Sequence, residues 1–169
     1  MAEPLADQVL RKIGEARELY HRLILIVGTE GSGKTSALQK VSASTSAPLV
    51  NVNLDLSRRM LDLTERQRAL QLPRLLGEIV NEATGDLPVA TRAAQVELVL
   101  LDNIEILFDV RLKQDPLRLL QGLSRNKTVV AAWNGSIVGG HVIYAVPNHP
   151  EYRRYPIRGF LVANSEMVT

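Results

Sequence analysis

One glycine-rich segment, Gly28–Thr35 (GTEGSGKT), constrains the fold of this chain more than any other feature of its sequence. It fits the pattern G-x-x-x-x-G-K-[ST], in which the glycines let the backbone curl so that consecutive N–H groups point inward at a phosphate. An apolar run, Leu23–Gly28 (LILIVG), comes before it, and a helical pattern begins at about Lys34. The sequence therefore predicts a strand, a phosphate-binding loop and a helix whose N-terminus adds partial positive charge.

The rest of the chain alternates between segments typical of strands and segments typical of helices. Strands are expected at residues 23–28, 48–53, 97–101, 128–133 and 141–146, with a short last strand at 160–163. Helices are expected at residues 5–22, from Lys34, across 54–84 as two helices with a break or kink at Pro73, and from Pro116 behind an Asp115 cap. A turn is expected at 85–88. This alternation predicts an α/β fold with a parallel sheet of about five strands and right-handed crossovers.

The 169 residues fit a single domain, with an amphipathic helix at 1–22, a core at 23–147 and a tail at 148–169. Because 46% of the residues are hydrophobic, a disordered chain is excluded, and the absence of cysteine excludes disulfides, thiol catalysis and cysteine-ligated zinc. The net charge of +2 does not favour a surface broadly adapted to DNA. The N-terminus lacks the apolar core of a signal peptide, and no apolar run approaches the ~18–20 residues of a membrane span. We therefore expect a cytoplasmic protein without membrane contact.

A carboxylate is expected beside the phosphate-binding loop. In Val96–Leu107 (VELVLLDNIEIL), four apolar residues lead to Asp102 at the end of a strand. This is the Walker B pattern, which accompanies a Walker A loop such as Gly28–Thr35. We expect Lys34 to reach the β- and γ-phosphates of ATP, and Thr35 and Asp102 to hold Mg²⁺. The residues expected to bind the nucleotide are Thr29, Glu30, Gly31, Ser32, Gly33, Lys34, Thr35 and Ser36.

Two further residues are candidates for catalysis. Many additional-strand ATPases have a glutamate directly after the Walker B aspartate, where this chain has Asn103, which cannot accept a proton from water. Glu105 is the substitute candidate for the general base, and the alternative is a solvated loop acid. Asn134 ends the strand Lys127–Asn134, where a sensor residue would contact the attacking water or the γ-phosphate; the alternative is a simple Asn-Gly turn.

Charge is unevenly distributed along the sequence. Residues 57–74 and 111–127 are rich in arginine and lysine, whereas the charged residues within 78–109 are mostly acidic. The simplest interpretation is solvated helix faces, but such asymmetry can also orient subunits of a homo-oligomer or contact DNA. An arginine that reaches a neighbour's nucleotide would raise hydrolysis by about 10³–10⁵-fold, and Arg125, Arg153 and Arg154 are candidates.

Five stretches, taken together, resemble the BrxF family, the small P-loop proteins of type 3 BREX phage-defence systems. They are GTEGSGKT, NVNLDLSRRMLDLTERQRALQLPRLL, LVLLDNIEILF, LSRNKTVVAAWNG and HPEYRRYP, in this order over nearly the whole chain. The resemblance implies a three-layer P-loop NTPase fold of the additional-strand, AAA-like type that acts with other BREX proteins. It implies nucleotide binding at Gly31–Thr35, Mg²⁺ at Asp102 and a sensor role for Asn134. Too few residues follow the strand at 141–146 for a C-terminal helical lid.

Several functions are compatible with these residues. The first is an ATPase or ATP-driven switch in a defence complex, with ATP and Mg²⁺ as ligands. The second is a non-catalytic assembly module that binds ATP as a structural ligand, which Asn103 favours. A small-molecule kinase is a third, although Asp55 is the one evident acceptor-binding carboxylate after the second strand. A GTPase is less well supported, because Asn126-Lys127 is not followed by the aspartate of a guanine-binding motif.

Overall fold

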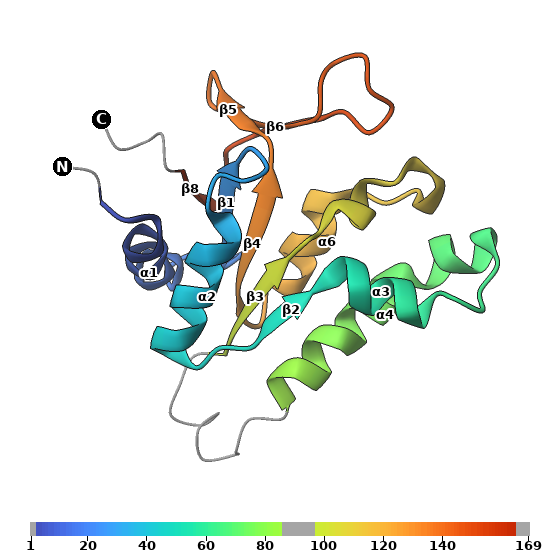
Figure 1. The fold of residues 1–169 in the computed structure, drawn as a ribbon, viewed down its shortest axis with the longest axis horizontal. Coiled ribbons are helices and arrows are strands. Elements are labelled where there is room, and N and C mark those ends of the chain that lie inside the picture. Colours follow the sequence, from blue (N-terminus) through green and yellow to red (C-terminus); the bar gives the residue numbers. More distant parts are fainter. Residues whose placement is uncertain (1–2, 86–96, 165–169) are drawn as a thin grey trace.

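The computed structural model describes residues 3–85 and 97–164 of the chain. A five-stranded sheet forms the central layer, with helices on both faces (Figure 1). Each pair of neighbouring strands in it is parallel. In spatial order the strands are β2 (Leu49–Asn51), β3 (Leu98–Asp102), β4 (Thr128–Asn134), β1 (Leu23–Gly28) and β8 (Leu161–Ala163). The α/β class and the parallel sheet of five strands predicted from the sequence are confirmed.

Strand β4 lies between β1 and β3, and this order brings distant segments together. Gly28 at the end of β1 is level with Asn134 at the end of β4. On the other side of β4, Asn51 at the end of β2 is level with Asp102 at the end of β3. Because parallel strands end at the same edge of a sheet, all four residues lie along one edge. That edge carries the candidate site.

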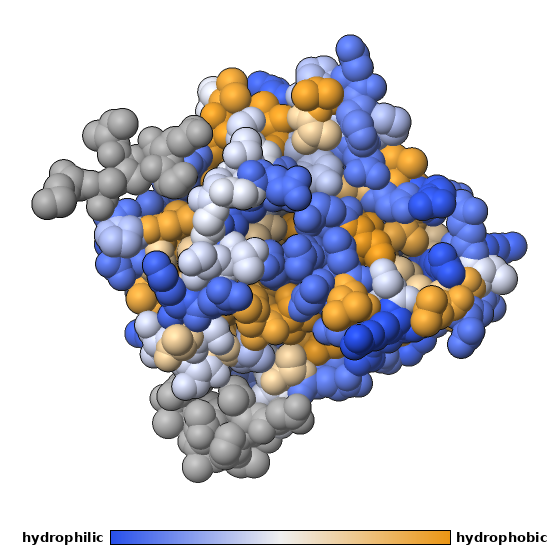
Figure 2. All heavy atoms as spheres, viewed as in Figure 1, coloured by the Kyte–Doolittle hydropathy of each residue, from blue (hydrophilic) through white to orange (hydrophobic). Residues whose placement is uncertain are grey.

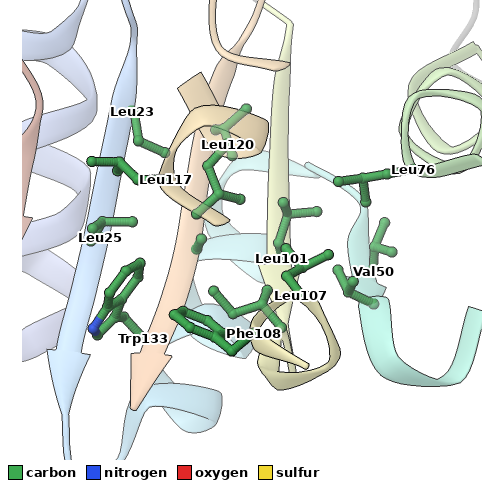
Figure 3. Close-up of a cluster of buried hydrophobic side chains, with 14 of the residues drawn as sticks. Leu23, Leu25, Val50, Leu76, Leu101, Leu107, Phe108, Leu117, Leu120 and Trp133 are labelled. Carbon is green, nitrogen blue, oxygen red and sulfur yellow. The ribbon is translucent and has the colours of Figure 1, made fainter. Parts of the chain in front are cut away.

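Alternate residues of β1 belong to two different hydrophobic clusters, which explains why the whole strand is apolar. Ile24 and Ile26 pack with helices α1 (Leu5–Ala16) and α2 (Lys34–Thr45). Leu23, Leu25 and Val27 pack on the other face, where Figure 3 shows Leu23 and Leu25 near Leu117. The elements on that face are α3 (Val52–Arg59), α4 (Glu65–Gly85), α6 (Pro116–Leu123) and the 3-10 helices η1 (Glu105–Phe108) and η2 (Val110–Leu112).

A small antiparallel sheet connects β4 to β8. Its strands are β5 (Ser136–Val138), β6 (His141–Tyr144) and β7 (Arg153–Pro156). It is fastened to β4 by Trp133, a fully buried side chain that donates a hydrogen bond from Nε1 to the carbonyl of Ile143 (3.2 Å). Trp133 also meets Phe108 and Tyr144 edge to face (Figure 3 shows the first pair). Trp133 is therefore a core residue.

The strand predicted at 141–146 is therefore not the fifth strand of the parallel sheet. The chain reverses at Gly139-Gly140, so residues 141–144 pair antiparallel with both of their neighbours. The fifth parallel strand is β8, which pairs with β1. Since β8 lies within the segment 148–169 that was set apart as a tail, the sheet extends beyond the predicted core of residues 23–147.

Other boundaries also differ from the predictions. The first helix ends at Ala16, short of residue 22. Strand β2 ends at Asn51, because the Asn51 side chain accepts a hydrogen bond from the Leu54 N–H and begins helix α3. Helix α4 continues through Pro73, so the break expected there is wrong. The division lies before Glu65 instead, where Thr64 and Gln67 exchange hydrogen bonds in a capping box.

The helix predicted from Pro116 begins there, with the Asp115 side chain accepting a hydrogen bond from Arg118 N–H as the predicted cap. Of the turn predicted at 85–88, residues 86–88 lie outside the described part of the chain. Within the described part, none of the helices combines the length and the apolar character that crossing a membrane requires.

Candidate functional site

The segment Gly28–Thr35, here called the glycine loop, joins the end of β1 to the start of α2. Two of its glycines illustrate why the loop disfavours residues with side chains. A Cβ at Gly28 would lie 2.4 Å from Ser32 Oγ, and Gly33 has a φ of +96°, which L-residues with side chains rarely adopt. Gly33 is also the residue that precedes the first turn of α2. These two positions therefore favour glycine where the chain passes from β1 into α2.

Lys34 is buried, with 7% of its surface exposed, and its side chain folds back over the glycine loop. Its Nζ donates hydrogen bonds to the carbonyl oxygens of Gly28 (3.0 Å) and Thr29 (2.6 Å) and lies 3.4 Å from Ser32 Oγ. Burial lowers the pKa of the Lys34 ammonium, while the carboxylates of Glu105 and Asp102 act in the opposite direction. The ammonium is thus held by loop carbonyls, which an anionic ligand can replace as a partner.

Thr35 and Asp102 meet although 67 positions separate them in the sequence. The Thr35 hydroxyl donates to Asp102 Oδ2 (2.7 Å), and Asp102 Oδ1 accepts a hydrogen bond from the Asn103 N–H (2.9 Å). Asp102 is buried at the end of β3. A hydroxyl and a carboxylate side by side are oxygen ligands of the kind that Mg²⁺ takes when phosphate oxygens and water complete its shell, so these residues fit that ion.

The two candidate catalytic residues also lie together. Asn134 Nδ2 donates a hydrogen bond to Glu105 Oε1 (3.0 Å), which joins the end of β4 to the first residue of η1. Burial raises the pKa of the Glu105 carboxyl, and the nearby Asp102 carboxylate adds to that effect. Glu105 is therefore a half-buried acid with a defined partner, and the alternative of a freely solvated loop acid does not describe it.

These groups line one cavity of about 390 Å³ at the carboxyl edge of the sheet. Its lining residues are Glu30, Gly31, Gly33, Lys34, Thr35, Ser36, Asp102, Asn103, Glu105, Ala132 and Asn134. Two residues that were expected to bind the nucleotide, Thr29 and Ser32, are not among them; the Thr29 carbonyl and the Ser32 hydroxyl face Lys34 Nζ instead. The structure thus brings all four predicted catalytic residues and most of the predicted phosphate-binding residues to one place.

Asn103, which directly follows Asp102, has a φ of +53°. This left-handed conformation is uncommon for residues with side chains, and asparagine is one of those that tolerate it best. The backbone bends there, and the next acidic residue, Glu105, is the one that reaches the cavity. The local conformation therefore explains how an acid two positions further along the chain takes a place at the site.

Asn53 is a site-supporting residue that the sequence analysis missed. Its N–H donates to the carbonyl of Asn103 (2.9 Å), and its Oδ1 accepts a hydrogen bond from the N–H of Ile106 (2.8 Å). It was expected to be the last residue of a strand at 48–53, and it lies instead in the first turn of α3. No sequence signal links it to residues 50 positions away.

Part of the uneven charge of the sequence is compensated by ion pairs in the structure. Arg59 pairs with Glu82 and lies 3.8 Å from Glu78, and Arg74 pairs with Glu78 (2.6 Å). Arg111 pairs with Asp109 in the same way. Figure 2 shows hydrophilic side chains interspersed with apolar ones over the face that it displays. These pairings favour the interpretation of solvated helix faces over a basic surface for DNA.

The three arginines suggested for action on a neighbour's nucleotide do not line the cavity of their own chain. The Arg125 guanidinium lies 5.4 Å from the ring centroid of Tyr20, and Arg125 precedes β4, at the opposite edge of the sheet. Arg153 donates to the carbonyl of Gln114 (3.0 Å), and the exposed Arg154 faces His141. Arg125 and Arg154 are exposed, whereas Arg153 is partly buried.

A comparison of the sequence with protein-family models found no match, and neither did a comparison with curated proteins. In residues 3–85 and 97–164, no group of three or more His, Asp or Glu side chains is arranged to hold a metal ion. The chemistry of this chain must therefore be inferred from the cavity itself, in which Lys34 faces three carboxylates, those of Glu30, Asp102 and Glu105.

Proposed function

We propose that this chain is a P-loop NTPase of the additional-strand, AAA-like type that binds ATP with Mg²⁺ and hydrolyses it. The observation that carries the proposal is the convergence of three strand ends. The glycine loop after β1, Asp102 at the end of β3 and Asn134 at the end of β4 line the same cavity, and Glu105 joins them through its hydrogen bond with Asn134. The position of β4 between β1 and β3 supports the additional-strand type.

In this proposal the phosphates of ATP lie against the backbone N–H groups of the glycine loop and the N-terminus of α2. The Lys34 ammonium exchanges the carbonyls of Gly28 and Thr29 for oxygens of the β- and γ-phosphates. Thr35 and Asp102 would hold Mg²⁺, which supplies positive charge to the phosphates when bound. The partly desolvated state of Lys34 favours this exchange, because a buried cation gains more from a charged partner than from a neutral one.

Glu105 is the general base in this mechanism. It accepts a proton from water as the water oxygen attacks the γ-phosphorus, and the bond from that phosphorus to the β–γ bridging oxygen breaks to leave ADP and phosphate. The Asn134 amide fixes the Glu105 carboxylate and, on the same edge, can orient the water. Because burial raises the pKa of Glu105, its carboxylate is a stronger base than that of a solvated glutamate.

The site is short of positive charge for a triphosphate, since its cavity is lined by Glu30, Asp102 and Glu105 and by one cation, Lys34. We therefore propose that the active form is a homo-oligomer or a complex in which another chain contributes a cation. The sequence resemblance supports a component of a BREX defence complex, in which DNA contact would be made chiefly by partners.

The second candidate is the non-catalytic assembly module. It is favoured by the hydrogen bond from the Asn134 amide, which already occupies one oxygen of Glu105.

A turnover assay distinguishes the two candidates. Glu105→Gln keeps an acceptor for Asn134 but cannot take a proton, so we expect unchanged ATP binding and a loss of turnover of about 10²–10⁴-fold. Glu18→Gln is the matched control, because Glu18 is an exposed glutamate outside the cavity. Turnover by wild type, alone or with its operon partners, that disappears only in Glu105→Gln supports the ATPase. ATP binding without turnover in every combination supports the assembly module.

A further inference from the structure

We infer that Asn53 is a positioning residue that fixes the segment carrying Glu105. This inference rests on the proposed function, since it assigns the residue that holds the proposed general base in place. Asn53 does not line the cavity, so it would act through Glu105 and not on the nucleotide.

Asn53 holds the Glu105 segment at two points, one on each side of Glu105. Its backbone N–H donates to the carbonyl of Asn103 (2.9 Å), two residues before Glu105. Its side-chain Oδ1 accepts from the N–H of Ile106 (2.8 Å), one residue after Glu105. Strand β2 makes this contact available, because Asn51 at its end is level with Asp102 at the end of β3.

The Glu105 segment needs such an external partner. The first N–H groups of a helix have no acceptor within the helix, and Ile104, which precedes η1, provides no side-chain cap. Asn53 Oδ1 meets this need from another element. The backbone of Asn103 also has a left-handed φ of +53°, so the chain enters η1 through a bend that a second contact stabilises.

Asn53 is itself held firmly. Its neighbours Val52 and Leu56 are fully buried in the hydrophobic core, and helix α3 is capped by Asn51. Of the two asparagines, Asn51 caps α3 and has no hydrogen bond with η1, whereas the Asn53 side chain bonds to η1. The chain therefore offers a matched pair of variants, one that weakens α3 and one that releases Glu105.

The first test compares kcat for ATP in Asn53→Ala and Asn51→Ala. We expect Asn53→Ala to lower kcat by about 10–100-fold with KM nearly unchanged, because misplacement of a catalytic group by about 1 Å has effects of this size. Asn51→Ala loses a helix cap and some thermal stability but keeps the Asn53 contact with η1, so its kcat should fall much less than that of Asn53→Ala. In a Glu105→Gln background, Asn53→Ala should cause no further loss, because its effect passes through Glu105.

The second test uses Asn53→Asp, whose carboxylate accepts the same Ile106 N–H but adds a negative charge beside η1. The added charge raises the pKa of Glu105, so the acid limb of the kcat profile should move to higher pH. In Asn53→Ala the carboxyl becomes more exposed, and the limb should move to lower pH. A residue that only stabilises the fold would leave the acid limb of Asn53→Ala in place. Wild-type kcat and an unmoved acid limb in Asn53→Ala would overturn the inference.

The outcome for Asn53 can be separated from the outcome for the proposed function. Failure of the wild-type chain and its partners to bind ATP would refute the proposed function. Should the protein bind nucleotide without turnover, or bind none, the titration of the Glu105 carboxyl is followed by ¹³C NMR in the same variants. Opposite shifts in Asn53→Asp and Asn53→Ala support the positioning role, and identical titration curves in wild type and both variants contradict it.

Discussion

The sheet has a buried lysine at each of its two edges, and the two differ in what surrounds them. Lys34 and Lys127 are 7% and 8% exposed. At the amino edge, Lys127 Nζ contacts three side chains: Asn81 Oδ1 (3.1 Å), Thr84 Oγ1 (3.3 Å) and Glu97 Oε2 (3.7 Å). At the carboxyl edge, Lys34 Nζ bonds chiefly to loop carbonyls.

The comparison shows that burial of a lysine does not by itself mark a functional site. Lys127 has a carboxylate and two neutral side chains as lasting partners, so its charge is compensated within the fold. Lys34 forms no salt bridge with the residues in 3–85 and 97–164, and it lines an open cavity. A cation whose present partners are neutral and replaceable is suited to bind an anion.

Removing each lysine amine should separate the two roles, and it should have the largest effect within this comparison. Lys34→Ala should weaken ATP binding about 100-fold, because contacts to a charged group contribute about 1.5–3 kcal/mol, and it should leave thermal stability nearly unchanged. Lys127→Ala should lower the free energy of unfolding by about 2 kcal/mol and leave ATP affinity as it is. Titration calorimetry and chemical denaturation measure the two quantities, and equal effects of the two variants on ATP binding would end the distinction.

The threonines beside these lysines sharpen the comparison at a smaller scale. Thr35→Ala removes a hydroxyl that bonds to Asp102, so the Mg²⁺ concentration for half-maximal ATP binding should rise about tenfold. Thr84→Val removes a hydroxyl that bonds to Lys127, which should cost about 1 kcal/mol of stability with no change in Mg²⁺ dependence. Magnesium titrations monitored by nucleotide fluorescence provide the measurement. An unchanged Mg²⁺ requirement in Thr35→Ala would remove this residue from the site.

The smallest expected effect concerns stability and pH at Glu105. Its folded-state pKa is raised by burial, so the folded protein binds the Glu105 proton more tightly than the unfolded chain does. The stability contributed by this group is therefore present at low pH and falls as pH rises through the unfolded and then the folded pKa. Glu105→Gln should be slightly more stable than wild type at pH 7 and not at pH 3. Denaturation midpoints at the two pH values test this sign, and a destabilised variant at pH 7 would show that the charged form is preferred.

The sequence alone predicted those parts of the site whose signals are local. The glycine loop follows from its own residues, and Asp102 and Asn134 follow from the rule that parallel strands end at one edge. Asn53 and the cluster around Lys127 could not be predicted in this way, because their partners are 30–53 positions distant in the chain. Strand β8 has three residues, and its partner β1 lies near the other end of the sequence. So short an apolar run does not indicate which sheet the strand joins.

The central claim is that the glycine loop binds the triphosphate of ATP and that Lys34 gives up loop carbonyls to do so. It is tested most directly by an experimental structure with a non-hydrolysable ATP analogue and Mg²⁺. We predict that the γ-phosphate lies in the cavity between Gly33, Asp102 and Asn134, with Lys34 Nζ moved from Gly28 and Thr29 to phosphate oxygens. An analogue bound elsewhere on the chain, or a bound analogue with Lys34 still on both carbonyls, would contradict the account.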